Sequence, residues 1–360
     1  MVDDKLTNLL MRQYETYPRS QVQDMLKLIY QNEFGCGHMI SDATQCLTMI
    51  NEEAETLSQA AASGDPVEYI GNGLCRLHLR VLRQSTLSPE TLNSFFMLTA
   101  NTPMGSAEGY EQKAAALINL CETGTLPFDA AEVSKMLTEN RDAGYPPFRH
   151  SEEFRAAYSP AYRVVNKAFC DFLPLFYRID ELSEREKRIT LAIDGVCASG
   201  KSTLAALLKS VYSCNLFSMD DFFLQSFQRT QARFDEPGGN VDYERFGKEV
   251  IEPLQSGNPF TYQIFDCQIM ELFELVDVTP NRLNVIEGVY SMRPEFIDTY
   301  DIKVFLTLDE VAQQRRLLER NPGMYDKFIN EWIPMENEYF DFFSLSAKCD
   351  FVFNTELFEE

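Results

Sequence analysis

The chain has 360 residues, of which 45% are hydrophobic and 24% charged, and its formal net charge is −23. This composition is typical of a folded protein, and the length is sufficient for two domains, each with its own core. The strong acidic charge opposes binding through a basic face that follows nucleic-acid phosphates, so we expect no nucleic-acid partner.

The chain contains no apolar run of about 18 residues and does not begin with a basic stretch followed by an apolar one. We therefore expect no membrane span and no signal peptide, and a cytoplasmic location. Nine cysteines are scattered along the chain without a C-x-x-C pair, which argues against a disulfide framework and against a cysteine zinc site.

Residues 1–180 show repeated helical patterns, and we predict an all-helical domain of unknown role there. Ser20 and Gln23 have the spacing of a capping box, apolar residues at helical spacing follow, and Gly35 marks an end. No strand pattern is evident in this half. Further helices are expected at residues 42–62, 66–84, 88–99, 108–122, 129–139 and 160–176.

All three histidines lie in this first half, at His38, His78 and His150. Together with Glu33 or Glu152 they could supply the ligands of a metal site. Their spacing matches no local metal motif, so scattered or hydrogen-bonded histidines are the preferred interpretation.

The pattern changes after the charged segment "DELSEREKR" at residues 180–188. Short apolar runs then alternate with helical stretches, which predicts an α/β domain over residues 186–360: a parallel sheet flanked by helices, with ligands at the carboxyl ends of the strands. The expected strands are residues 189–193, 216–219, 283–286, 302–308 and 351–353.

A phosphate-binding loop follows the first of these strands. The stretch "GVCASGKST" fits G-x-x-x-x-G-K-[ST], in which backbone N–H groups and the start of a helix bind phosphate oxygens. Lys201 would reach the β- and γ-phosphates, and the Ser202 hydroxyl would bind Mg²⁺. The nucleotide-binding candidates are Gly195, Ala198, Ser199, Gly200, Lys201, Ser202 and Thr203.

Two acidic residues follow other strands at what should be the same edge of the sheet. Asp220, in "FSMDDFFL", is placed to accept the proton of an attacking hydroxyl, although Asp220 or Asp221 could instead cap the next helix. Glu287, in "LNVIEG", could hold Mg²⁺ or its waters, but alone it is a weak signal.

Taken together, these motifs resemble the uridine kinase-like branch of the P-loop kinases, over roughly residues 188–355. The resemblance rests on "GVCASGKST", "MDDFF", "RFDEPGGNVDYERF" (233–246), "VIEGVY" (285–290) and "DIKVFLTLDEVAQQRRLLERN" (301–321). It implies that Asp220 is the catalytic aspartate and that Glu287 is the acid on the metal side. It also implies that Phe223 and Asp235 contact the acceptor. Arg233, Tyr243 and Arg245 lie in the same segment as Asp235 and are further candidates for acceptor binding.

In this branch, arginines of a lid helix stabilise charge on the transferred phosphoryl group. The resemblance nominates Arg316 and Arg320 as catalytic, with Arg315 as the alternative register. A solvated helix face paired with Glu310 and Glu319 explains these arginines about as well.

The chain also departs from uridine kinases, because it has "IFDCQIM" at 264–270 and no histidine after residue 150. Arg233, Arg245 and Arg293 in the acceptor segments suggest an anionic or oxygen-rich acceptor, and structural salt bridges explain them equally well.

The resemblance implies an ATP- and Mg²⁺-dependent kinase that phosphorylates a hydroxyl of a small molecule: a nucleoside such as uridine, or a related sugar or hydroxy acid. The alternative is a nucleotide-dependent switch or binding module whose helical half engages a partner. The presence of both Asp220 and Glu287 weighs against that alternative. Formation of a homo-oligomer stays open.

Overall fold

The computed structural model of the chain describes residues 4–36, 41–57 and 64–358. By its internal contacts the chain divides into two compact units, residues 1–181 and 182–359. None of the helices that the structure describes is both long and apolar enough to cross a bilayer.

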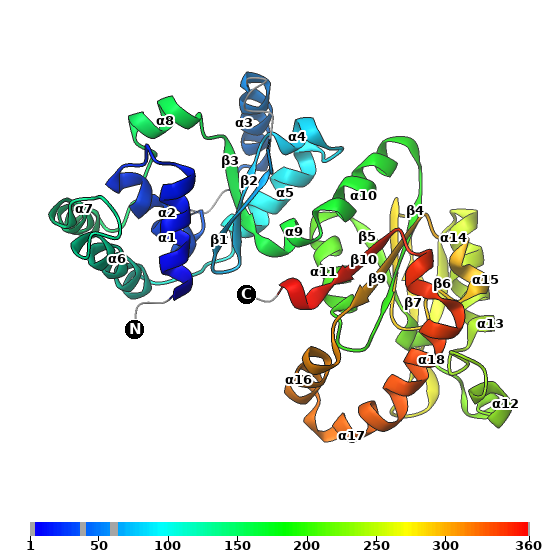
Figure 1. Cartoon of the computed structure of the whole chain (residues 1–360). Coiled ribbons are helices and arrows are strands. Elements are labelled where there is room, and N and C mark those ends of the chain that lie inside the picture. Colours follow the sequence, from blue (N-terminus) through cyan, green and yellow to red (C-terminus); the bar gives the residue numbers. More distant parts are fainter. Residues whose placement is uncertain (1–3, 37–40, 58–63, 359–360) are drawn as a thin grey trace. The chain divides into compact units, whose positions relative to one another are not determined.

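The first unit is rich in helices, as the sequence predicts (Figure 1). Helix α2 starts with a capping box between Gln21 and Asp24, one residue later than the predicted pair, and ends at Gly35, whose φ is 63°. Its apolar face is fully buried in the core of the unit. The helices are α1 (Asp4–Thr16), α2 (Val22–Phe34), α3 (Ala43–Thr56), α4 (Val81–Gln84), α5 (Pro89–Ala100), α6 (Ala107–Glu122), α7 (Ala130–Asp142), α8 (Glu152–Tyr158), α9 (Lys167–Asp171) and α10 (Leu173–Arg185).

The prediction that this half is all-helical is wrong, because the unit also contains an antiparallel sheet in the order β1-β2-β3. Most of the helix expected over 66–84 is instead a hairpin of β1 (Val67–Gly71) and β2 (Leu74–His78), and the helix expected from 160 begins as β3 (Tyr162–Asn166). Asn72 and Gly73 form the turn with φ of 53° and 69°. An Asn-Gly pair with positive φ is a strong local hairpin signal, and the sequence analysis missed it.

The second unit contains a parallel five-stranded sheet in the order β10-β9-β4-β8-β5. All five predicted strands are confirmed, and with helices flanking the sheet this is the α/β fold expected for a P-loop kinase domain (Figure 1). Strand β4 is central in the sheet. Strands β5 and β8 lie on one side of it, and β9 and β10 lie on the other, so the strand order changes direction at β4. The carboxyl end of β4 is therefore the expected position of a ligand. The strands are β4 (Ile189–Gly195), β5 (Cys214–Ser218), β8 (Leu283–Glu287), β9 (Ile302–Thr307) and β10 (Phe351–Asn354).

One face of this sheet is packed by a core of aromatic and aliphatic side chains that includes Phe217 from β5, Ile286 from β8 and Tyr339 from α18. A separate antiparallel hairpin, β6 (Phe260–Asp266) and β7 (Glu271–Val278), adds Tyr262 to the same core. The α-helices of the unit are α11 (Lys201–Val211), α12 (Gln231–Phe234), α13 (Tyr243–Phe246), α14 (Glu252–Ser256), α15 (Pro294–Ile297), α16 (Glu310–Arg320), α17 (Tyr325–Lys327) and α18 (Ile333–Phe343).

Candidate phosphate-binding and catalytic site

The predicted phosphate loop lies between the carboxyl end of β4 and the start of α11. Gly195 has φ of 138°, and a Cβ atom there would lie 2.1 Å from the Leu306 carbonyl oxygen. Gly200, the N-cap of α11, has φ of 93°. Both positions therefore need glycine, the first for close approach to β9 and the second for its left-handed backbone.

Three consecutive carbonyls of the loop accept hydrogen bonds from side chains that lie later in the chain. Gln313 donates to the Cys197 carbonyl at 3.0 Å, Arg316 to the Ala198 carbonyl at 3.0 Å, and the Thr355 hydroxyl to the Ser199 carbonyl at 3.0 Å. Holding the carbonyls in this way fixes the peptide planes of the loop. The first amides of α11 have no acceptor within the helix, so the helix start offers N–H donors suited to an anion.

Lys201 and Ser202 begin α11 and point back toward the loop and toward β8. The Lys201 ammonium donates to the carbonyls of Gly195 at 2.8 Å and Val196 at 3.0 Å. The Ser202 hydroxyl donates to a carboxylate oxygen of Glu287 at 3.1 Å. The motif on α11 and the acid at the end of β8 are therefore in direct contact, as the edge of a parallel sheet requires.

Asp220 follows β5 at the same edge. Its carboxyl is exposed, yet surrounding protein raises its pKa, and the charges of Lys201 and Arg320 oppose that rise. The amide of Asp220 donates to the Ser218 hydroxyl at 3.3 Å, so the cap of the short helix here is Ser218. This geometry leaves Asp220 available for chemistry.

The neighbouring Asp221 accepts a hydrogen bond from the Tyr262 hydroxyl at 3.2 Å. Burial, with a smaller contribution from the charge of Asp220, raises its pKa to about 6 against the lowering effect of the Tyr262 hydrogen bond. Burial likewise raises the pKa of Glu287, with the charge of Asp220 also contributing. Three carboxyl groups therefore repel one another beside the phosphate loop, an arrangement that a bound cation would relieve.

The oxygens of Ser202 and Glu287 suit Mg²⁺ in chemistry. Within the described residues there is no group of three or more His, Cys, Asp or Glu side chains arranged to hold a metal. Mg²⁺ usually takes only one or two protein oxygens and completes its shell with phosphate and water, so the hydroxyl and carboxylate donor pair fits that ion.

The two nominated lid arginines have different surroundings. Arg316 donates to the Ala198 carbonyl and, at 3.0 Å each, to the hydroxyl and carbonyl of Thr355, which ties it to the loop backbone. Arg320 is exposed at the end of α16, and its charge acts on both Asp220 and Cys197. Arg320 is thus the arginine whose charge bears on the candidate base, and the catalytic roles of both stay predictions.

The arginines of the acceptor segments are engaged in contacts within the unit. Arg233 forms a two-point ion pair with Glu244 at 2.9 and 2.8 Å. Arg245 is buried, stacks over the Phe222 ring and donates to the carbonyls of Asp221 and Gln263. Arg293 pairs with Glu236 at 3.1 Å. These contacts favour the salt-bridge interpretation of the three arginines.

The remaining acceptor candidates also differ in exposure. The buried Tyr243 hydroxyl donates to the Gly238 carbonyl at 2.8 Å, and Phe223 is partly buried against the core. Asp235 is exposed and accepts from Gln231 at 2.8 Å. Their predicted roles in acceptor binding are retained as proposals.

Two acids that the sequence analysis did not nominate contact the loop. Glu336 on α18 is buried and accepts the Cys197 amide at 2.9 Å, and burial raises its pKa to about 7. Asp194 is fully buried and accepts from the amides of Gly195 (2.7 Å) and Met292 (3.2 Å) and from the Tyr339 hydroxyl (3.0 Å). Burial raises the Asp194 pKa to about 6. Both acids accept backbone amides of the loop and so help to hold its conformation.

The loop cysteine, Cys197, is not activated by its position. Burial and the charge of Glu336 raise the pKa of its thiol to about 11, although Lys201 and Arg320 act in the opposite direction. A thiol with so high a pKa is a poor nucleophile at neutral pH, which argues against a redox role for the loop.

The histidines of the first unit do not form a metal site among the described residues. His150 hydrogen-bonds Asp24 at 2.8 Å, and His78 contacts Glu68 at 3.3 Å, so these two take part in separate polar contacts. His38 lies outside the described residues.

No protein-family model matches the chain. Among curated proteins it is 25% identical over 158 residues to the inorganic pyrophosphatase TTM2 of Arabidopsis thaliana, a match that covers 42% of this chain and 23% of that protein. The chain therefore spans about a quarter of the length of that relative.

Several solved structures are similar to about half of the chain. They include a protein described as a possible uridine kinase from Bacillus stearothermophilus, with 24% identity over 50% of this chain and 100% of that one and a TM-score of 0.39. A fructose transport system kinase candidate from Silicibacter sp. TM1040 shares 21% identity over 51% and 97% of the two chains, with a TM-score of 0.37. Shikimate kinase from Bacteroides thetaiotaomicron shares 14% over 46% and 85%, with a TM-score of 0.24. All three are named as kinases.

Proposed function

We propose that the second unit is a phosphotransferase that uses ATP and Mg²⁺ to phosphorylate a hydroxyl group of a small molecule. The observation that carries the proposal is the meeting of three strand ends at one sheet edge. The phosphate loop follows β4, Asp220 follows β5, and Glu287 ends β8 within 3.1 Å of the Ser202 hydroxyl. Such convergence supplies phosphate binding, a base and oxygen ligands for a cation in one place.

In the proposed reaction, the loop amides and Lys201 bind the β- and γ-phosphates and hold the γ-phosphorus in line with the acceptor. The acceptor oxygen bonds to that phosphorus, the bond to the β-phosphate oxygen breaks, and Asp220 takes the hydroxyl proton as ADP leaves. Mg²⁺ bound at Ser202 and Glu287 would neutralise phosphate charge. Arg320 would add positive charge beside Asp220 when α16 lies over the phosphates.

For the acceptor we propose a nucleoside such as uridine or another neutral molecule rich in hydroxyl groups, such as a sugar. Arg233 and Arg293 already pair with Glu244 and Glu236, so they offer little free charge to an anionic acceptor. The exposed Asp235 offers a carboxylate that can accept hydrogen bonds from sugar hydroxyls.

The proposal is tested by transfer of radiolabelled γ-phosphate from ATP with Mg²⁺ to a panel of nucleosides, sugars and hydroxy acids. We expect labelled product with a nucleoside or a sugar. The hydroxy acids test whether an anionic acceptor is used. Pyrophosphate hydrolysis is measured in parallel, because one relative of the chain is named as a pyrophosphatase. ATP binding without transfer to any acceptor would overturn the proposal in favour of a nucleotide-dependent switch.

A further inference from the structure

The first unit contains a cavity that the proposed kinase reaction does not use. Its volume is about 610 Å³, and its walls come from α2, α3, α5 and β3 and from His150 and Pro160 before β3. This volume lies in the range that small organic ligands occupy in proteins. The question is which chemistry its lining would recognise.

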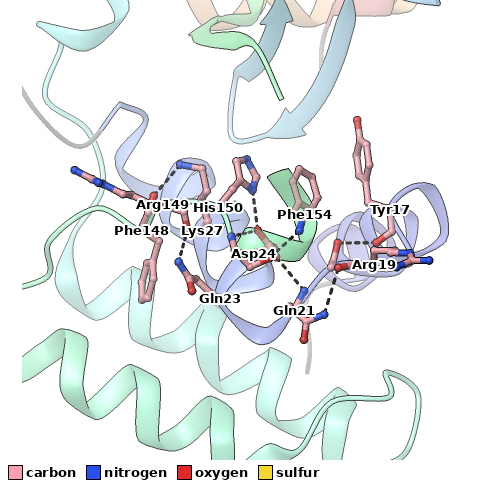
Figure 2. A network of polar contacts seen from close by, with 12 residues as sticks. Tyr17, Arg19, Gln21, Gln23, Asp24, Lys27, Phe148, Arg149, His150 and Phe154 are labelled. Carbon is pink, nitrogen blue, oxygen red and sulfur yellow. Dashed lines mark hydrogen bonds and ion pairs between the residues drawn. The ribbon is translucent and has the colours of Figure 1, made fainter. Parts of the chain in front are cut away.

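Two cations line the cavity, and Lys27 is the one that forms no ion pair among the described residues. Its ammonium donates to the Phe148 carbonyl at 2.8 Å (Figure 2), and among the described residues no ion pair joins it to a carboxylate. An ammonium group has three N–H donors, so two remain for a ligand. The other lining cation, Arg163, is held by both oxygens of Glu53 at 2.8 and 2.9 Å.

The electrostatic surroundings of Lys27 favour an added anion. Burial and, to a smaller extent, the charge of Arg76 lower the pKa of its ammonium, the charge of Asp24 opposes them, and the resulting pKa is about 8. Arg76 is itself 1% exposed and pairs with Glu68 at 2.8 Å. A negative ligand group beside Lys27 would replace the hydration that the ammonium has lost.

The wall beside Lys27 is fixed by a chain of polar contacts (Figure 2). Asp24 accepts from His150 Nδ1 at 2.8 Å and from the Ser151 hydroxyl at 2.6 Å, and His150 Nε2 lies 2.6 Å from the Tyr162 hydroxyl. Burial lowers the pKa of His150 to about 4, so the ring is neutral at pH 7, with Nδ1–H donating to Asp24 and Nε2 accepting from Tyr162. Burial also raises the pKa of the Tyr162 hydroxyl, so neither ring adds charge to the cavity at neutral pH.

Two large apolar side chains also line the cavity. Met49 on α3 is 49% exposed although it is a large hydrophobic side chain, and Phe96 on α5 is partly buried beside it in the cavity wall. Asp42, the N-cap of α3, is the lining carboxylate outside the Glu53 pair, and it is exposed to water that screens its charge. The lining is therefore amphipathic, with one cation that no carboxylate pairs among the described residues and with an apolar part.

We propose that this cavity binds a small organic anion, whose carboxylate or phosphate group accepts hydrogen bonds from the Lys27 ammonium while its apolar body lies against Phe96 and Met49. Such a site would give the first unit a ligand of its own, separate from the nucleotide of the second unit.

The test uses the full chain carrying Lys201→Ala, so that the phosphate loop does not contribute to anion binding. Benzoate and phenyl phosphate share one aromatic body and differ in the charged group, and each is titrated at pH 7 by calorimetry. We expect at least one of them to bind, and Lys27→Met in the same background to weaken binding about tenfold or more. Lys135→Met is the matched control, because Lys135 is exposed on α7 and should leave the affinity unchanged.

A pH series separates a ligand contact from a structural role of Lys27. Benzoate affinity should be constant between pH 6 and pH 7 and fall as the pH rises through about 8, because the ammonium then loses its proton. Lys27→Arg should retain binding but lose this alkaline decrease, since a guanidinium stays charged there. If phenyl phosphate binds more tightly than benzoate, the affinity of phenyl phosphate is measured instead, at a series of pH values above 7.

The results of these titrations either support the proposed anion site or overturn it. Preference for benzoate or for phenyl phosphate identifies the anionic group and supports the site. Failure of both probes to bind, unchanged affinity in Lys27→Met, or an affinity that does not respond to pH would each overturn the proposal. None of these results depends on whether the second unit is a kinase.

Discussion

Replacing Lys201 with alanine should reduce phosphoryl transfer about a hundred- to a thousand-fold, the loss expected when a pre-organised charge contact to the transition state is removed. In the present geometry the ammonium lies over the loop, bonded to the carbonyls of Gly195 and Val196. If phosphate oxygens are bound at the loop, the same ammonium is placed to turn from these carbonyls toward them. The measurement is the steady-state rate with the acceptor found in the transfer assay.

Lys209 provides the matched control, because it is an exposed lysine on the same helix, α11. Lys209→Ala should stay within about twofold of the wild type, as surface changes usually do. Trp332, the single tryptophan, lies in the second unit, so its fluorescence can show that the Lys201 variant is folded. A folded Lys201→Ala enzyme with more than a tenth of the wild-type rate would contradict the assignment of the loop.

Replacing Asp220 with asparagine should reduce kcat by about a hundred- to ten-thousand-fold and leave ATP binding nearly unchanged. Asparagine has the same shape but cannot accept the hydroxyl proton. The wild-type rate should also rise with pH on the acid side, as the Asp220 carboxyl, whose pKa surrounding protein raises, loses its proton. That acid limb should be absent from the Asp220→Asn profile.

Asp221→Asn is the control that distinguishes the two adjacent carboxylates. Asp221 is engaged with the Tyr262 hydroxyl at 3.2 Å, so its replacement should affect packing more than chemistry and retain most of the rate. The opposite pattern, with Asp221→Asn inactive and Asp220→Asn active, would move the base to Asp221.

The second unit was predictable because its elements and its motif are local in sequence. Each of the five strands is a short apolar run with helical stretches around it, and the loop residues 195–203 are contiguous. The rule that parallel strands place their carboxyl ends together then brings Asp220 and Glu287 to the loop without any further information. The contact between Ser202 and Glu287 is of this kind.

The polar cluster of the first unit was not predictable, because its contacts are distant in sequence. Asp24 and His150 are 126 residues apart, and neither lies in a motif. The hairpin of β1 and β2 could have been found from Asn72-Gly73, but its apolar residues were assigned to a helical pattern instead. The strand β3 pairs with β2 over a long separation, and such pairing leaves little local signal.

In the second unit, the contacts of Glu336 and Thr355 were not predictable from the sequence for the same reason. Both contact the phosphate loop from segments that follow the last recognisable motif. A buried glutamate in an aromatic helix could have been noted as unusual, because an ionisable group among Trp332, Tyr339 and Phe340 needs a polar partner. Its partner, an amide of the loop, could be found only in three dimensions.

The buried Asp194 couples the folding of the second unit to the uptake of a proton. Its pKa is about 6 when folded against an ordinary value of 3.8, so its contribution to stability is complete below pH 3.8 and is lost as the pH rises through 6. The difference corresponds to about 3 kcal/mol in the free energy of unfolding. Denaturation followed by Trp332 fluorescence should show a smaller loss in Asp194→Asn than in the wild type, because the raised pKa values of Asp221 and Glu336 remain in the variant. Equal pH dependence in the two proteins would contradict the assignment to Asp194. If Asp220 is the base, it must be deprotonated to act, so the pH that favours catalysis and the pH at which Asp194 adds most to the stability of the unit lie in opposite directions.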